Sequence, residues 1–214
     1  MSRLESLRRG GFYPLEQEFV PHLINLFNPS KNKGRILDPF AGTGEVVQQL
    51  GEAWNLDVYS VENDLERGKA CRERFGLTRS ITDDAYECSI SQMSFPVVYL
   101  NPPYNNDIVS EELYGIRRSE WRALNVFRKQ VQDGGYVIWV AYSQHMSQGV
   151  FELLGKYFNN INVYRFPEEH LDHYTQICIV AQLEKGKKPP SEGQIMQNAP
   201  RFIELGKHPE KIKD

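Results

Sequence analysis

Cysteine is scarce in this chain, and the three that occur show no Cys-x-x-Cys spacing. The sequence therefore indicates neither a disulfide framework nor a cysteine zinc cluster. His170 and His173 could start a metal site, but no third ligand accompanies them, so we expect no metal. Long hydrophobic runs are also missing. No stretch approaches the ~20 apolar residues that cross a bilayer, and the first residues show no signal-peptide core. We expect a cytoplasmic protein without membrane contact.

An excess of charge of one sign is absent as well, because the formal net charge is only −3 over 214 residues. This length is typical of one domain, since domains usually contain ~100–200 residues. After about residue 184 the sequence becomes polar and rich in Pro, Gly and Lys. We therefore predict one domain over residues 1–184 and a polar, basic C-terminal tail over residues 185–214.

Short runs of β-branched and aromatic residues alternate with helical patterns along this domain. The expected strands are 35–38, 58–61, 79–81, 97–100, 136–141, 161–166 and 176–182. The expected helices lie near 15–27, 44–54, 64–75, 119–132 and 147–158. Such alternation predicts a mostly parallel sheet with helices on both faces. The last two strands lack a connection of helix length, so we expect them to form an antiparallel hairpin.

A glycine-containing turn follows the first expected strand and opens a helix. It comprises Asp38, Pro39, Phe40, Ala41, Gly42, Thr43 and Gly44. Two glycines at alternate positions let the backbone approach a ligand closely. No Lys-Ser/Thr follows, which excludes a P-loop, and Val47 takes the third glycine position of a dinucleotide fingerprint. Glu62 ends the second strand, where a carboxylate can accept hydrogen bonds from ribose hydroxyls. This pair favours a nucleoside-containing ligand without a pyrophosphate.

A second motif, Asn101-Pro102-Pro103-Tyr104, follows the fourth expected strand. With the glycine turn and the strand-end acid, in this order, the sequence resembles S-adenosylmethionine-dependent amino-methyltransferases, above all the N6-adenine type. The likeness covers roughly residues 11–182 and extends to small uncharacterised methyltransferase-like proteins of bacteria and mobile elements. It implies a Rossmann-like class I methyltransferase fold, with a seven-stranded sheet ending in an antiparallel hairpin.

Each residue of the Asn-Pro-Pro-Tyr motif suits the methylation of an exocyclic amine for a physical reason. The side-chain oxygen of Asn101 and the carbonyl of Pro102 can accept the two N–H groups of one exocyclic amine. Two converging acceptors orient the nitrogen lone pair and disperse positive charge during attack. Pro103 stiffens the turn, and Tyr104 offers a flat face for stacking a base. We assign Asn101, Pro102, Pro103 and Tyr104 as catalytic residues.

The resemblance also places contacts to S-adenosylmethionine. Asp84, with Ala85, matches the acidic position that receives the adenine amino group, although Asp83 is an alternative. Phe12, Tyr13 and Pro14 resemble the motif that closes over the methionine end, but Leu15-Glu16 replaces the usual second Thr-Pro. The predicted cofactor residues are Phe12, Tyr13, Pro14, Asp38, Phe40, Ala41, Gly42, Thr43, Gly44, Glu62, Asn63, Asp84 and Ala85.

Basic residues gather in the segment after this motif. Between residues 116 and 129, five cationic side chains oppose only Glu120, and Trp121 lies among them. Cations with an interleaved aromatic suit phosphates and an unstacked base, so we assign Tyr104, Arg117, Arg118, Trp121 and Arg122 to substrate binding. The alternative is an amphipathic helix with a solvated basic face and Trp121 packed inward.

These features predict a methyltransferase that acts on N6 of adenine in DNA. The alternatives are RNA adenine or protein glutamine methylation, or a non-catalytic nucleic-acid-binding subunit of a methyltransferase complex. By resemblance, a DNA methyltransferase carries an additional target-recognition domain, and we expect none within these 214 residues. We therefore expect either little sequence choice, a protein partner that confers specificity, or RNA as substrate.

Overall fold

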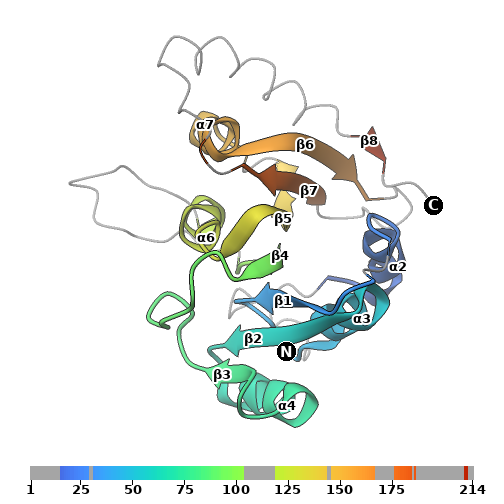
Figure 1. Ribbon diagram of the computed structural model, residues 1–214, viewed down its shortest axis with the longest axis vertical. Coiled ribbons are helices and arrows are strands. Elements are labelled where there is room, and N and C mark those ends of the chain that lie inside the picture. Colours follow the sequence, from blue (N-terminus) through green and yellow to red (C-terminus); the bar gives the residue numbers. More distant parts are fainter. Residues whose placement is uncertain are drawn as a thin grey trace, which may run out of the picture.

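A computed structural model describes residues 15–28, 31–103, 119–143, 146–166, 176–184, 186 and 210–211. These residues build one twisted sheet with helices against both of its faces (Figure 1). Within this part of the chain no helix is long and apolar enough to span a membrane. The strands are β1 (Gly34–Asp38), β2 (Leu56–Glu62), β3 (Ser80–Thr82), β4 (Phe95–Leu100), β5 (Val131–Tyr142), β6 (Phe158–Arg165), β7 (Gln176–Leu183) and β8 (Glu210–Lys211).

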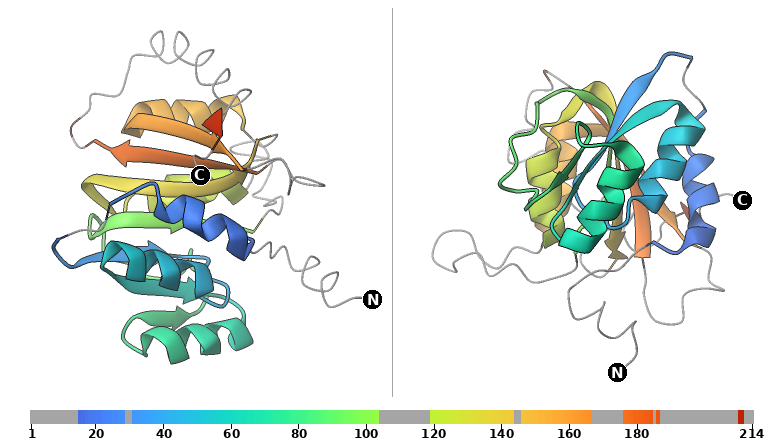
Figure 2. Two further views of the ribbon diagram at one scale, coloured as in Figure 1. Left: turned by 90° about the vertical axis from the view of Figure 1, so that its right-hand side faces the viewer. Right: turned by 90° about the horizontal axis from the view of Figure 1, so that it is seen from below.

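The strand order in the sheet is β3-β2-β1-β4-β5-β7-β6-β8. The pairs from β3 to β5 are all parallel, whereas β7 runs antiparallel to both β5 and β6. The arrow of β7 accordingly points opposite to its neighbours in the left panel of Figure 2. The expected mostly parallel, Rossmann-like sheet with an antiparallel last hairpin is therefore confirmed.

Two hydrophobic clusters cover the faces of the sheet. On one face α6 (Ser119–Phe127) and α7 (Gln148–Tyr157) bury Leu124, Phe127 and Phe151. On the other face a 3-10 helix η1 (Gln17–Phe19), α2 (Val20–Ile24), α3 (Glu45–Trp54) and α4 (Leu65–Phe75) bury Leu23, Leu50 and neighbouring side chains. In Figure 1, α6 and α7 lie to the left of the sheet, and α2 and α3 to its right. Both clusters hold the carboxyl ends of β1, β2 and β4 at a common edge.

The first expected helix, 15–27, is shorter in the structure. Its apolar stripe is buried as predicted, but only 17–24 form helix, as η1 followed by α2. Beyond Asn25 the chain tightens, with N–H groups of Leu26 and Phe27 donating to carbonyls three residues back. Asn28 precedes a proline, a position that disfavours helical backbone. The periodic pattern of apolar residues therefore extends a few residues beyond the end of the helix.

The largest difference from the sequence prediction lies between α6 and β5. The expected helix 119–132 ends at Phe127, and Val131 already pairs with Phe95 in the sheet. The ladder is then interrupted before Val97 pairs with Tyr136, and Gly134 in between has φ +72°. The expected strand 136–141 is therefore extended at its start by a Gln-Asp-Gly-Gly bulge, because tertiary pairing with β4 recruits Val131.

Pairing with distant strands also changes two other expected elements. Phe158 starts β6 instead of ending the preceding helix, so the expected strand 161–166 begins earlier and ends at Arg165. In the predicted tail, Glu210–Lys211 form β8, which pairs in parallel with Tyr164 and Arg165 of β6. This pair adds an eighth strand to the seven that were expected.

Candidate active site

The register of the parallel strands brings the predicted motifs to one edge of the sheet. Asp38, the last residue of β1, is level with Ser60, two residues before the end of β2. Glu62, the last residue of β2, is level with Thr82 at the end of β3. Leu37 is level with Val98, so β4 ends at this edge too, directly before Asn101. The glycine turn, Glu62, the Asp83-Asp84 pair and Asn101 are thus neighbours, as expected for a binding edge of a parallel α/β sheet.

The glycine turn has the backbone conformation that its two glycines predict. Gly42 and Gly44 have φ values of +58° and +80°, in the left-handed region that other residues avoid. A Cβ on Gly44 would lie 2.7 Å from the ring of Phe75 and 3.3 Å from Sγ of Cys71. Gly44 is therefore required both by its conformation and by the close packing of the turn on α4.

The carboxylate of Glu62 is fixed by the turn rather than exposed to solvent. Its Oε2 accepts the N–H of Gly42 at 2.8 Å, and its Oε1 accepts the N–H of Asp64 at 2.9 Å. Arg67 adds two charge-assisted bonds to Oε1, of 3.1 Å from Nε and 2.7 Å from Nη2. An ionised carboxylate offers about four acceptor positions, so Oε2 keeps room for one further donor.

Residues of α4 that the sequence analysis did not assign hold this turn. Besides Arg67, the thiol of Cys71 donates to the carbonyl of Gly42 at 3.2 Å, and Nε of Arg74 donates to the carbonyl of Thr43 at 3.0 Å. Burial raises the pKa of Cys71 to about 12, which keeps the thiol protonated as a donor. Their helical spacing, one face of the helix after Glu62, is the signal that could have identified them.

Asp38 is buried beneath the same turn, with 2% of its surface exposed. Its Oδ1 accepts the N–H of Phe40 at 2.9 Å. Burial raises the pKa of Asp38 to about 8, partly offset by that hydrogen bond and reinforced by the negative charge of Glu62. Around neutral pH this side chain therefore carries a proton, and the turn does not have to accommodate two adjacent buried charges.

The other predicted cofactor residues occupy different environments. Phe40 belongs to an aromatic cluster, with ring centroids 5.8 Å from Tyr86 and 5.4 Å from Phe127. The N–H of Ala41 donates to the carbonyl of Val61, which ties the turn to β2. Asn63 is exposed directly after Glu62. Phe12, Tyr13 and Pro14 lie outside the described residues.

The two acids after β3 cap a turn. Oδ1 of Asp83 accepts the N–H of Asp84, and Oδ1 of Asp84 accepts the N–H of Tyr86 at 2.9 Å. Ala85 is buried and Asp84 half-buried, whereas Asp83 is exposed. The predicted contact of Asp84 with an adenine amino group stays a prediction. Its carboxylate already anchors the local backbone, in the manner of an Asx turn.

The Asn-Pro-Pro-Tyr motif begins where β4 leaves the sheet. Asn101 and Pro103 are half-buried and Pro102 is buried, so the first three residues of the motif form part of the protein wall at this edge. Tyr104, Arg117 and Arg118 lie outside the described residues.

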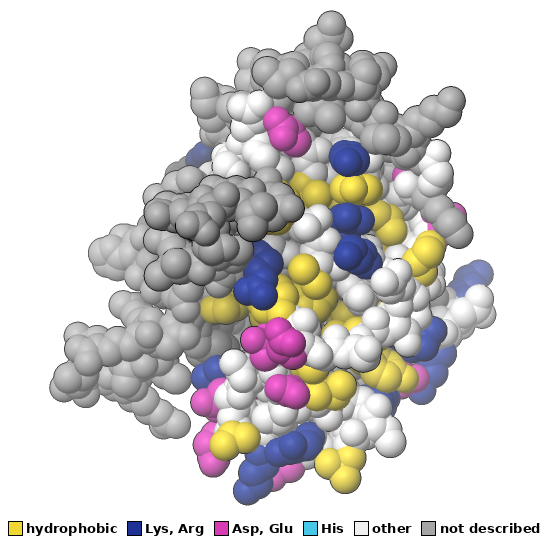
Figure 3. All heavy atoms as spheres, turned by 90° about the vertical axis from the view of Figure 1, so that its left-hand side faces the viewer, with side chains coloured by type: hydrophobic (Ala, Val, Ile, Leu, Met, Phe, Trp, Pro, Cys, Tyr) yellow, Lys and Arg dark blue, Asp and Glu magenta, His cyan; other side chains and the backbone are white. Residues whose placement is uncertain are grey.

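The described part of the predicted substrate segment packs against the fold. The indole Nε1 of Trp121 donates to the carbonyl of Gly149 at 3.2 Å, linking α6 to α7. The guanidinium of Arg122 lies over the ring of Tyr86, 3.8 Å from its centroid, and Arg128 lies 3.7 Å over the ring of Tyr157. On the side of the molecule shown in Figure 3, several Lys and Arg side chains lie near one another with hydrophobic side chains between them, and most of the Asp and Glu side chains lie below them. Arg122 and Arg128 themselves cover different aromatic rings.

The geometry can be compared with known proteins at this point. The family model described as "Uncharacterised methyltransferase family (DUF6094)" matches residues 1–204. No curated protein is similar enough to this chain to match it.

Several solved structures share the fold at low sequence identity. A Listeria monocytogenes protein described as a class I S-adenosylmethionine-dependent methyltransferase has a TM-score of 0.61 at 15% identity, covering 94% of this chain and 77% of its own. A Thermotoga maritima S-adenosylmethionine-dependent O-methyltransferase has a TM-score of 0.58 at 16% identity, covering 86% and 71%. The tRNA (m1A58) methyltransferase of Aquifex aeolicus has a TM-score of 0.54 at 17% identity, covering 81% and 71%. These likenesses establish the fold, and their different methyl acceptors leave the substrate open.

Proposed function

This chain belongs to the uncharacterised methyltransferase family, and we propose that it transfers a methyl group from S-adenosylmethionine to an exocyclic amine, N6 of adenine in DNA. The observation that carries the proposal is the shared edge of β1, β2 and β4. There the carboxylate of Glu62 accepts the N–H of Gly42 at 2.8 Å, and Asn101-Pro102-Pro103 follow β4 directly.

The order of the candidate residues across the sheet supports S-adenosylmethionine as the cofactor. Asp84 follows β3, Glu62 ends β2, the glycine turn follows β1, and Asn101 follows β4, in the order in which these strands lie side by side. Three strand spacings separate the first from the last, roughly 14 Å. A ligand laid along this edge with adenine at Asp84 and ribose at Glu62 would have its methionine part over the glycine turn and its reactive methyl group towards Asn101.

Within this proposal each described residue has a defined task. The remaining acceptor position on Oε2 of Glu62 takes a ribose hydroxyl, while Arg67 keeps the carboxylate in place. The oxygens of Asn101 and Pro102 accept the two N–H groups of the target amine, which directs its lone pair at the methyl carbon. When bound, the cofactor supplies a sulfonium whose methyl–sulfur bond breaks as the nitrogen attacks. The nitrogen then loses a proton to solvent.

Nucleic acid is the proposed partner because of the cations beside this edge. Arg122 holds its guanidinium over the ring of Tyr86, next to the turn that starts at Asp84. Within this proposal Arg122 contacts a phosphate of the substrate. A protein partner that confers sequence specificity is also part of the proposal. The alternative reaction at the Asn-Pro-Pro motif is methylation of RNA adenine or of protein glutamine.

The deciding experiment is tritiated methyl transfer from S-adenosylmethionine to DNA, RNA and protein in parallel, followed by identification of the methylated nucleoside or amino acid. We expect N6-methyladenine in DNA. Label in RNA or in glutamine would redirect the substrate assignment while keeping the amine chemistry. No transfer to any acceptor, with intact cofactor binding, would favour a non-catalytic subunit.

A pair of variants tests the role of the motif itself. Asn101→Ala should abolish transfer and leave the Kd for S-adenosylmethionine nearly unchanged, because the proposed task of the amide is to bind the acceptor amine and not the cofactor. Asn125→Ala removes an amide from α6, where it accepts a bond from Arg128, and serves as the matched control. Transfer by Asn101→Ala at the rate of this control would overturn the catalytic assignment.

A further inference from the structure

A hollow lies at the end of the sheet opposite the candidate active site, where the parallel strands begin. It is a cleft of about 590 Å³, bordered by Gly34 at the start of β1, Leu56 at the start of β2 and Pro96 near the start of β4. The length of β2, from Leu56 to Glu62, separates this cleft from the proposed active site. At about 3.3 Å per residue that distance is roughly 20 Å. Pockets for small ligands typically measure ~300–1,000 Å³, so this cleft has sufficient volume for one.

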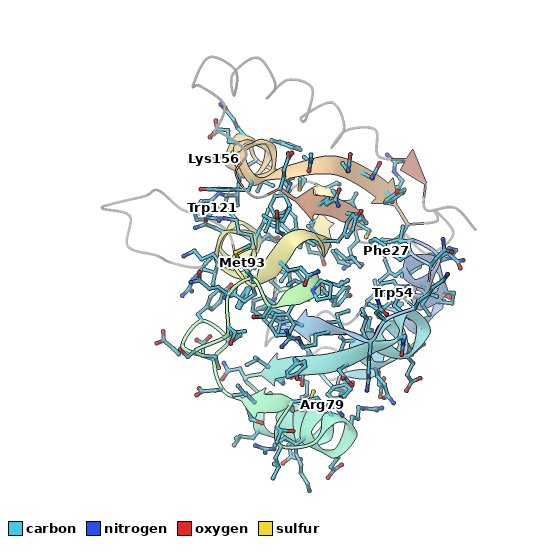
Figure 4. The ribbon with its side chains drawn as sticks, viewed as in Figure 1. Phe27, Trp54, Arg79, Met93, Trp121 and Lys156 are labelled. Atoms are coloured by element: carbon cyan, nitrogen blue, oxygen red, sulfur yellow. The ribbon has the colours of Figure 1, made fainter. Side chains whose placement is uncertain are left out.

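One side of the cleft is aromatic. Phe27 contacts Trp54 and Tyr136 edge to face, with ring centroids 5.3 Å and 5.0 Å apart. Phe27 and Trp54 lie side by side near the ends of α2 and α3 (Figure 4). Phe27 and Tyr136 are only half-buried, so part of each ring is exposed to the cleft. Because these edge-to-face contacts hold the rings in place, the exposed face of a single ring can stack a planar group.

The other side carries cations whose charge is only partly neutralised. Lys33 pairs with Asp57 at 3.1 Å, but Arg79 already binds the same carboxylate oxygen at 2.7 Å. Arg35 is exposed and lies 5.7 Å from the ring of Phe95, and no described residue forms a hydrogen bond with its guanidinium. The lining therefore presents an arginine fork and an ammonium group whose acidic partner is shared, which suits a phosphate.

Polar amides also line the cleft. Asn28 and Gln132 line it and are both exposed. Each amide offers a donor and an acceptor, the combination needed by the edge of a nucleobase or by sugar hydroxyls. Exposed aromatic rings, cations and amides in one cleft match the base, the phosphate and the sugar hydroxyls of a phosphorylated nucleoside.

We propose that this cleft is a second ligand site, which binds a nucleoside monophosphate unit at the amino ends of the strands. The base stacks on Tyr136 and meets Phe27 edge to face, and the phosphate binds Lys33 and Arg35. The unit comes either from a free nucleotide or from a nucleic-acid strand. The inference does not depend on the reaction at the carboxyl edge, which lies at the other end of β2.

The test measures AMP binding to the full chain by calorimetry with saturating S-adenosylhomocysteine, which keeps AMP out of the proposed cofactor site. We expect one AMP per chain, with weaker binding of adenosine and of inorganic phosphate because each supplies only half of the contacts. Backbone amide signals of Gly34, Gly134 and Gly135, which line the cleft, should shift in NMR spectra during the titration. A short single-stranded oligonucleotide that binds more tightly than AMP identifies nucleic acid as the source, and the reverse order identifies a free nucleotide.

Charge-removing variants complete the test. Lys33→Gln and Arg35→Gln should each weaken AMP binding about tenfold, as expected for the loss of a charge-assisted contact. Asp57 keeps Arg79 as its partner in the first variant, so its charge stays paired. Lys31→Gln removes an exposed cation close in sequence but outside the cleft lining, and should leave the affinity unchanged. The proposal is overturned if neither AMP nor the oligonucleotide binds, if phosphate alone binds as tightly as AMP, or if both cleft variants bind like the control.

Discussion

Replacing Asp38 by asparagine isolates the titration of one buried carboxyl beneath the glycine turn. Its pKa in the folded protein is about 8, against an ordinary value of 3.8, chiefly because burial disfavours the charged form. Between these two values the folded state holds a proton that the unfolded state has released. The free energy of unfolding must therefore fall as pH rises through this window and level off above about pH 8. The amide introduced by Asp38→Asn would keep an oxygen to accept the N–H of Phe40 but could not titrate.

The expected size of the effect follows from linkage. A proton bound only in the folded state changes the free energy of unfolding by about 1.4 kcal/mol per pH unit. From pH 5 to pH 8 the wild type should therefore lose roughly 3–4 kcal/mol relative to Asp38→Asn. Single domains are stable by about 5–15 kcal/mol, so a loss of this size is a large fraction of the total.

The assay is urea unfolding of the cofactor-free protein at several pH values between 5 and 8. Asp38→Asn should become more stable relative to wild type with each step to higher pH. Glu52→Gln, at an exposed position of α3 where the carboxylate accepts only the amide of Gln48 among the described residues, measures what removal of a surface carboxylate contributes. Parallel profiles of Asp38→Asn and wild type across this range would refute the buried, protonated state of Asp38.

Three further changes probe the residues around the turn and the substrate segment. Gly44→Ala should lower the free energy of unfolding by about 2–5 kcal/mol, from backbone strain and from overlap with the aromatic ring of Phe75 on α4. A loss no larger than the strain alone, about 1–2 kcal/mol, would exclude the steric contribution. Arg67→Met should weaken S-adenosylmethionine binding roughly five- to tenfold in calorimetry, because the carboxylate of β2 loses its charged donor, and Lys69→Met on the same helix should not; unchanged affinity would contradict the positioning role. Trp121→Phe should lower the free energy of unfolding by about 1 kcal/mol through loss of its hydrogen bond to α7, and an unchanged value would contradict that packing role.

Much of the fold could be predicted from the sequence because strand composition is local. Each of the seven expected strands appears, and the short link before β7 correctly predicted the antiparallel hairpin. The boundaries that failed are those decided by distant partners. Val131 reads as the continuation of an apolar helix face, yet it pairs with Phe95. Glu210 and Lys211 read as a charged tail, yet they add to the edge of β6.

The candidate site was predictable only as a list of motifs. The sequence indicated that Gly42 and Glu62 act together, and the structure joins them by a direct hydrogen bond. The contribution of α4 was missed, because in the sequence Arg67, Cys71 and Arg74 are residues of an amphipathic helix like any other. Their contacts with Glu62 and the glycine turn exist only when the helix packs on the sheet. The sequence predicted that the cations of residues 116–129 form a basic segment. In the structure Arg122 lies over the ring of Tyr86, a contact that depends on the direction of the side chain and not on net charge.

By itself the sequence determined the alternation of strands and helices. It also determined which residue types lie at the carboxyl edge of the parallel strands: two glycines where positive φ is needed, a strand-end acid and an Asn-Pro-Pro turn. Periodicity and backbone constraints act over a few residues, so they can be recognised from the sequence alone. Only the tertiary structure decided which charges are buried and which are paired. It placed Asp38 away from water, bound Glu62 to Arg67, and opened a cleft with Lys33 and Arg35 at the far end of the sheet. These properties depend on the dielectric surroundings and on contacts between segments far apart in the chain, which no local pattern encodes.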